Sequence, residues 1–193
     1  MHDSGLTEAR GVSNRRPADR TVPVWDLPLR LWHWALAACV LVAWFTPTVY
    51  DSLHRIFGYT VIGLLVFRLA WGFWGSRYSR FRMIGIRLRA APSYLWNLRR
   101  GITGRYLGLN PAGTLMMVTL LLSLAVSAIT GALSVTVTFF GVWWIEDTHA
   151  WASDAVIVLV VLHVAGVVGM GLLQRENLIR AMITGRKRIR GRS

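Results

Sequence analysis

The sequence has few cysteines and few charged residues, the residues that cross-link secreted proteins and cover the surface of soluble ones. It contains one cysteine, Cys39, among 193 residues, so no disulfide can form within the chain. Charged residues make up 16% of the chain, and none occurs in residues 31–50 or 111–145. Uncharged apolar stretches of this length are typical of membrane-spanning helices. These absences exclude a disulfide-stabilised secreted domain and predict an integral membrane protein.

The charge that is present is mostly of one sign. The chain has 22 Lys and Arg residues against 9 Asp and Glu, which gives a formal net charge of +13. Nucleic-acid binding would require these basic residues to line a soluble surface. They instead flank the apolar stretches, so we interpret them as determinants of membrane orientation and expect membrane lipid, not nucleic acid, around the chain.

The apolar stretches predict an all-α fold, an integral membrane four-helix bundle. We expect spanning helices at about 29–50, 54–75, 112–135 and 146–173, within a transmembrane domain at 23–174. The polar segment 1–22 is predicted to be a disordered N-terminal tail, with a partner-docking arm as the alternative. Residues 175–193 are predicted to form a basic cytoplasmic tail.

The charges on the connections predict the orientation. Residues 76–110 contain eight arginines and no acid, and the segment after residue 173 contains seven basic residues and one acid. The two short connections are acidic and carry Asp51, Glu146, Asp147 and Asp154. By the positive-inside rule, both termini and the middle connection are cytoplasmic. The aromatic and aliphatic residues at 94–98 further predict an amphipathic segment on the membrane surface within that middle connection.

Four histidines lie in or at the ends of the predicted helices, where an unpartnered imidazole is costly to bury: His33, His54, His149 and His163. His149 and His163 are 14 residues apart, on one face of one helix and separated by about 21 Å. Given the predicted helix directions, His33 lies level with His163, the inner pair, and His54 lies level with His149, the outer pair. Two pairs at two depths indicate two metal centres stacked across the membrane; isolated interfacial histidines are the alternative.

Two imidazoles at each level fit haem better than zinc. A structural zinc site needs four protein ligands, and no Cys, Asp or Glu completes such a set at both levels. Haem brings four nitrogens of its own and needs only two axial ligands. Because the chain has no C-x-x-C-H motif for covalent attachment, we expect two haem b groups with bis-histidine ligation. Six-coordinate iron favours electron transfer over oxygen chemistry.

Three arginines are candidates for binding the anionic haem propionates. Arg30 precedes His33 by about one helical turn, and Arg55 is adjacent to His54. Arg68 lies 14 residues after His54, on the same helix face at the inner level. Snorkelling of Arg68 to the lipid headgroups is the alternative.

Five stretches of the chain resemble the bacterial cytochrome b561 family, which includes the b-type cytochrome subunits of nickel–iron hydrogenases. They are VWDLPLRLWHW (24–34), HRIFGYTVIGLLVFRLAWGFWGSRYSRF (54–81), RYLGLNPAGTLMM (105–117), HVAGVV (163–168) and RENLIRAMITGRKR (175–188). The resemblance implies a four-helix bundle with two b haems, whose ligands fall by position on the same four histidines. It also implies electron exchange with the membrane quinone pool. The chain departs from the pattern at Ala150, where relatives often have an acid, and this weakens any proton role there.

We therefore predict a dihaem b-type cytochrome of the bacterial cytoplasmic (inner) membrane. It would transfer electrons between a periplasmic or membrane redox protein and the quinone pool, and a homodimer is left open. One alternative is an enzyme, a self-sufficient quinone-dependent oxidoreductase of a small oxidant such as superoxide. The other alternative is a haem-free membrane anchor whose histidines are interfacial.

Overall fold

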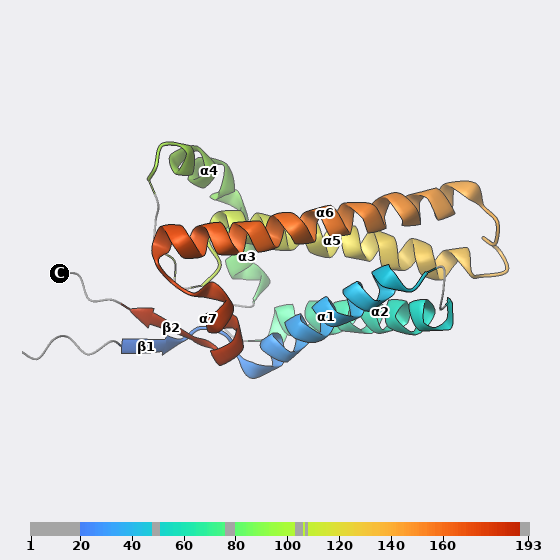
Figure 1. Cartoon of the computed structure of the whole chain (residues 1–193), viewed down its shortest axis with the longest axis horizontal. Helices are drawn as coiled ribbons and strands as arrows, with labels where there is room; N and C mark the ends of the chain where they lie inside the picture. The colour runs from blue at the N-terminus through green and yellow to red at the C-terminus, as the bar shows by residue number, and fades with distance from the viewer. Residues whose placement is uncertain (1–19, 48–50, 76–79, 103–105, 107, 190–193) are drawn as a thin grey trace, which may run out of the picture.

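Four long helices run side by side and form most of the molecule (Figure 1). The computed structural model describes residues 20–47, 51–75, 80–102, 106 and 108–189. Each of the four helices is long and apolar enough to cross a membrane: α1 (Leu27–Phe45), α2 (Asp51–Trp74), α5 (Pro111–Ser134) and α6 (Trp143–Gln174). The prediction of a mostly helical chain with four membrane-spanning helices is confirmed.

The helix boundaries follow from local capping chemistry. The Asp26 carboxylate accepts a hydrogen bond from the backbone N–H of Leu29 at 2.9 Å, which caps the start of α1. At the start of α5, the Asn110 side chain accepts from the N–H of Gly113 at 2.6 Å, and Pro111 is the first helical residue. Helix α1 ends at Phe45, earlier than predicted, because Pro47 disfavours a helical conformation at the residue before it.

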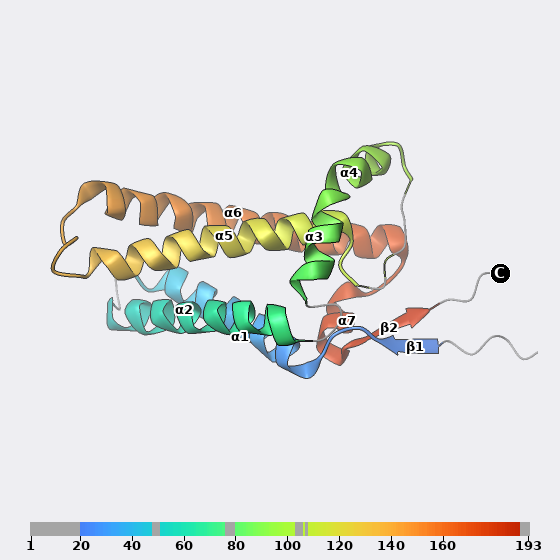
Figure 2. The ribbon, with the colours of Figure 1, turned by 180° about the vertical axis from the view of Figure 1, so that it is seen from behind.

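The helices form two antiparallel hairpins that pack face to face, α1 with α2 and α5 with α6 (Figures 1 and 2). Their core joins all four helices and includes Trp32 and Cys39 from α1, Val61 from α2, Leu124 from α5 and Val156 from α6. Cys39 is a buried, free cysteine within this core. Many large apolar side chains on the outside of the bundle remain exposed, as expected of helices that face lipid.

The smaller elements gather at one end of the bundle (Figures 1 and 2). They are β1 (Arg20–Pro23), α3 (Phe81–Arg89), α4 (Ala91–Arg99), α7 (Leu178–Thr184) and β2 (Arg186–Ile189). The strands pair antiparallel, with Arg20 opposite Ile189 and Pro23 opposite Arg186. Neither the strands nor α7 were expected from the sequence. Of the segment 1–22 predicted to be a disordered tail, residues 1–19 lie outside the described residues and residues 20–22 belong to β1.

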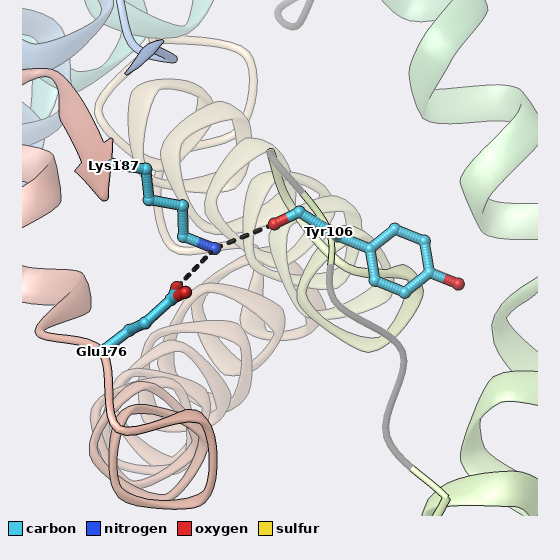
Figure 3. A network of polar contacts seen from close by, with 3 residues as sticks. All are labelled: Tyr106, Glu176 and Lys187. Carbon is cyan, nitrogen blue, oxygen red and sulfur yellow. Dashed lines mark hydrogen bonds and ion pairs between the residues drawn. The ribbon is translucent and has the colours of Figure 1, made fainter. Parts of the chain in front are cut away.

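A polar network anchors the C-terminal segment to the rest of the chain (Figure 3). Lys187 Nζ lies 3.1 Å from Glu176 Oε2, and both side chains are only 12–13% exposed. The same ammonium donates a hydrogen bond to the backbone carbonyl of Tyr106 at 2.9 Å. Nearby, Arg30 of α1 donates to the carbonyls of Met182 (3.1 Å) and Ile183, at the C-terminal end of α7. These contacts hold α7 and β2 against the start of α1 and against Tyr106.

Candidate functional site

The four histidines meet as two pairs, and each pair bridges the two helix hairpins. In the inner pair, the ring centres of His33 on α1 and His163 on α6 are 6.4 Å apart. In the outer pair, the ring centres of His54 on α2 and His149 on α6 are 5.9 Å apart. The structure thus brings together the residues that helix depth had paired, and their role as haem ligands stays a prediction.

The spacing within each pair fits one metal ion between two imidazoles. Two metal–nitrogen bonds of about 2 Å, together with the ring radii, place the ring centres about 6 Å apart. Within the described part of the chain, no group of three or more His, Cys, Asp or Glu residues could hold a metal ion. A metal at either pair would therefore need ligands from outside the described residues, and the four porphyrin nitrogens of haem would supply them.

Hydrogen bonds orient both rings of the outer pair. His54 Nδ1 lies 2.8 Å from the carbonyl oxygen of Ala43, and His149 Nδ1 lies 2.8 Å from the carbonyl oxygen of Ser127. Because a carbonyl can only accept, each Nδ1 carries the hydrogen and donates it. Each Nε2 is then left with the lone pair that a metal requires.

Helix α5 supports His149 from behind. A Cβ atom added at Gly131 would lie 2.7 Å from His149 Cε1 and 2.9 Å from His149 Nδ1. The ring therefore packs directly on the α5 backbone, in a space that only glycine leaves open. One turn earlier, Ser127 Oγ donates to Ser153 Oγ at 2.7 Å, because the Ser153 hydroxyl hydrogen is already donated to the His149 carbonyl.

A cleft of about 380 Å³ opens between the hairpins around the outer pair. All four spanning helices contribute to it, and most of its wall is apolar: Val40, Trp44, Val61, Leu124, Val156 and Ile157. Besides the two histidines, the polar side chains of Ser127, Ser153 and Asp154 also line the cleft. An apolar cleft with two imidazoles in its wall suits a flat apolar group with a metal at its centre.

The inner pair has a different polar environment. His33 packs edge-on against Trp34, with 5.2 Å between the ring centres. Its Nδ1 atom is buried, with no hydrogen-bond partner in the described part of the chain. A buried nitrogen without a partner is costly, and among the described residues the His33 ring lacks the Nδ1 hydrogen bond that orients both outer histidines.

The structure gives the three candidate arginines different surroundings. Arg68 is 3% exposed, with its guanidinium carbon 5.8 Å from the centre of the Trp32 ring and 5.9 Å from that of Phe81. Arg55 forms an exposed ion pair with Asp51 at 2.8 Å. Arg30 is engaged with the α7 carbonyls described above. Their predicted role in binding haem propionates therefore stays a prediction.

Sequence reasoning missed the residues on α5 that support His149. Ser127 and Gly131 lie in an uncharged apolar stretch that contains no histidine. One signal could have identified them: two small residues four positions apart, a spacing that lets helices pack closely in membranes.

Known proteins are similar to this chain over the region that contains both histidine pairs. A family model described as prokaryotic cytochrome b561 matches residues 24–185. A protein of Azotobacter chroococcum mcd 1 named "Probable Ni/Fe-hydrogenase B-type cytochrome subunit" is 26% identical over 216 aligned positions, covering 85% of this chain and 87% of the relative. The protein of the same name from Azotobacter vinelandii is 24% identical with the same coverage.

Proposed function

The chain belongs to the prokaryotic cytochrome b561 family of membrane-bound b-type cytochromes, and from this premise we propose that each of its two histidine pairs binds one haem. The observation that carries the proposal is the pairing itself. Ring centres 6.4 and 5.9 Å apart, at two levels of one bundle, have the spacing that one metal between two imidazoles requires. Bound haem would supply one-electron oxidation and reduction of its iron.

The chain's own residues would hold and tune these two groups. His54 and His149 present Nε2 because backbone carbonyls engage their Nδ1 atoms, and Gly131 allows His149 to pack on α5. The apolar walls of the cleft exclude water from the outer site. The buried charge of Arg68 favours the reduced form of a nearby redox centre, because that form carries one positive charge less.

We further propose that the chain carries electrons across the bacterial cytoplasmic (inner) membrane between a redox protein and the quinone pool. The basic residues of the middle connection and the C-terminal segment support a cytoplasmic location for both termini and for α3 and α4. The outer pair would then face the periplasm. The two Azotobacter relatives are named as hydrogenase subunits, which supports a metalloenzyme of that kind as the redox partner.

The test is haem content and its dependence on single histidines. The chain is purified in detergent from a host that supplies haem, and its reduced-minus-oxidised spectrum and haem per chain are recorded. We expect about two b haems per chain; His33→Ala removes mainly one and His149→Ala mainly the other. His2→Ala, which changes the remaining histidine of the chain, is the matched control and leaves the content unchanged.

Other outcomes overturn defined parts of the proposal. One haem in the unchanged chain would show that only one pair is a ligand pair. No haem would leave a haem-free membrane anchor. Quinone-dependent turnover of superoxide by the isolated chain, without any protein partner, would replace the electron-carrier role with the oxidoreductase alternative.

A further inference from the structure

Helix α4 has one face fixed to the protein and one face free. Its residues Ala91 and Tyr94 are 2% and 6% exposed, and the Tyr94 ring packs edge-on against Tyr106 with 5.6 Å between ring centres. The side of the helix turned away from Tyr94 presents Trp96, which is 56% exposed, and Leu95 beside it is 39% exposed. We propose that this free face of α4 and the adjoining Arg100 form a binding site for anionic phospholipid headgroups.

The position of α4 places this face where lipid headgroups lie. Helix α3 runs across the bundle at the end where β1, β2 and α7 gather, and α4 stands out from the side of the bundle there (Figures 1 and 2). The ends of membrane-spanning helices mark the interface between the hydrocarbon core and the headgroups. An exposed face that projects sideways at this level meets the lipid around the protein.

The free face combines an apolar groove with guanidinium groups. The groove has a volume of about 450 Å³ and is lined by Pro92, Leu95, Trp96, Leu98 and Arg99. The guanidinium carbon of Arg100 lies 5.0 Å from the centre of the Trp96 ring, so the cation stacks on the indole. Stacking occupies only the face of a guanidinium and leaves the N–H groups at its edge available for the forked hydrogen bonds that match a phosphate.

The charge pattern around the groove selects an anionic lipid over a zwitterionic one. Residues 76–110 contain eight arginines and no Asp or Glu. A zwitterionic headgroup brings an ammonium group along with its phosphate, and no carboxylate of this segment is there to receive it. A headgroup of net negative charge meets only favourable charges. Tryptophan and leucine on the same face favour a lipid over a soluble acidic protein, because a lipid offers both phosphate and apolar glycerol and acyl groups.

The test measures lipid preference of the full-length chain. The chain is purified in detergent, stripped of lipid and offered an equimolar mixture of phosphatidylglycerol and phosphatidylcholine. The lipids that remain bound are counted by native mass spectrometry. We expect the unchanged chain to prefer phosphatidylglycerol, and R99Q/R100Q to reduce that preference at least about fivefold, the effect of about one basic residue near an anionic surface.

Two variants keep the result interpretable. Arg180→Gln removes an exposed arginine of α7 at the same end of the bundle and keeps the preference. R99K/R100K keeps the charge and restores most of the preference, which distinguishes headgroup binding from a folding defect. The haem spectrum of each variant stays that of the unchanged chain, so failure here is separable from failure of the proposed cytochrome function.

Three outcomes would overturn the proposal. The first is equal retention of the two lipids by the unchanged chain. The second is an equal loss of preference in R99Q/R100Q and Arg180→Gln, which would reflect net charge and not a site. The third is binding of soluble poly-glutamate as tight as that of phosphatidylglycerol, which would assign the face to an acidic protein.

Discussion

Replacing Gly131 by alanine tests how α5 positions the outer histidine pair. The added Cβ would lie 2.7 Å from His149 Cε1, whereas non-bonded carbon atoms prefer about 3.5–4.0 Å. The imidazole must therefore move by about 1 Å. Such a shift breaks the 2.8 Å hydrogen bond from His149 Nδ1 to the Ser127 carbonyl, which contributes on the order of 1 kcal/mol.

The displacement is larger than a metal centre tolerates. Ligand distances in metal sites hold to about 0.2 Å, so a ring shifted by about 1 Å is no longer a good axial ligand. Loss of an orienting hydrogen bond lowers metal affinity by about 10–100-fold. We therefore expect Gly131→Ala to reduce haem content from about two per chain toward one, with the redox titration of the inner centre unchanged.

The control and the refuting result use the same assay. Gly63→Ala adds a methyl group on α2 where nothing lies within 4 Å, and it should leave haem content and both midpoint potentials unchanged. Two haems with unchanged potentials in Gly131→Ala would refute the reasoning. That result would mean that the α5 backbone shifts to accommodate the methyl group, and that haem ligation by His149 does not require contact with Gly131.

Two further predictions concern buried charges. Lys187→Met removes both the ion pair to Glu176 and the hydrogen bond to the Tyr106 carbonyl, so we expect a loss of about 2 kcal/mol, measured as a lower thermal unfolding midpoint; an unchanged midpoint would contradict this. Arg68→Gln removes a positive charge at 3% exposure, so the midpoint potential of the inner centre should fall by tens of millivolts in a redox titration. An equal fall at both centres would show that Arg68 acts on neither one locally.

The histidine pairing could be predicted because it depends on regular geometry. Helical rise separates His149 from His163, and the charges of the connections give the direction of each helix. Neither step requires knowledge of a side-chain contact. Helix boundaries were also close, because Pro28 and Pro111 mark helix starts in the sequence itself.

The features that were not predicted depend on contacts between distant parts of the chain. Arg30 donates hydrogen bonds to carbonyls of α7 that lie more than 150 residues later in the sequence, and no local sequence pattern predicts such a partner. The strands β1 and β2 pair residues 20–23 with residues 186–189, in basic segments without the apolar alternation of ordinary strands. The role of Gly131 depends on the His149 ring of α6, which packs against it and is distant from it in the sequence.

The pairing of β1 with β2 has a consequence for biosynthesis. Strand β1 precedes α1 and β2 follows α7, so their pairing joins the segment before the first spanning helix to the segment after the last one. Each histidine pair likewise joins a residue of the first hairpin to one of α6. Neither pair can exist while α6 is still being synthesised, so any group that needs both imidazoles enters a nearly finished chain.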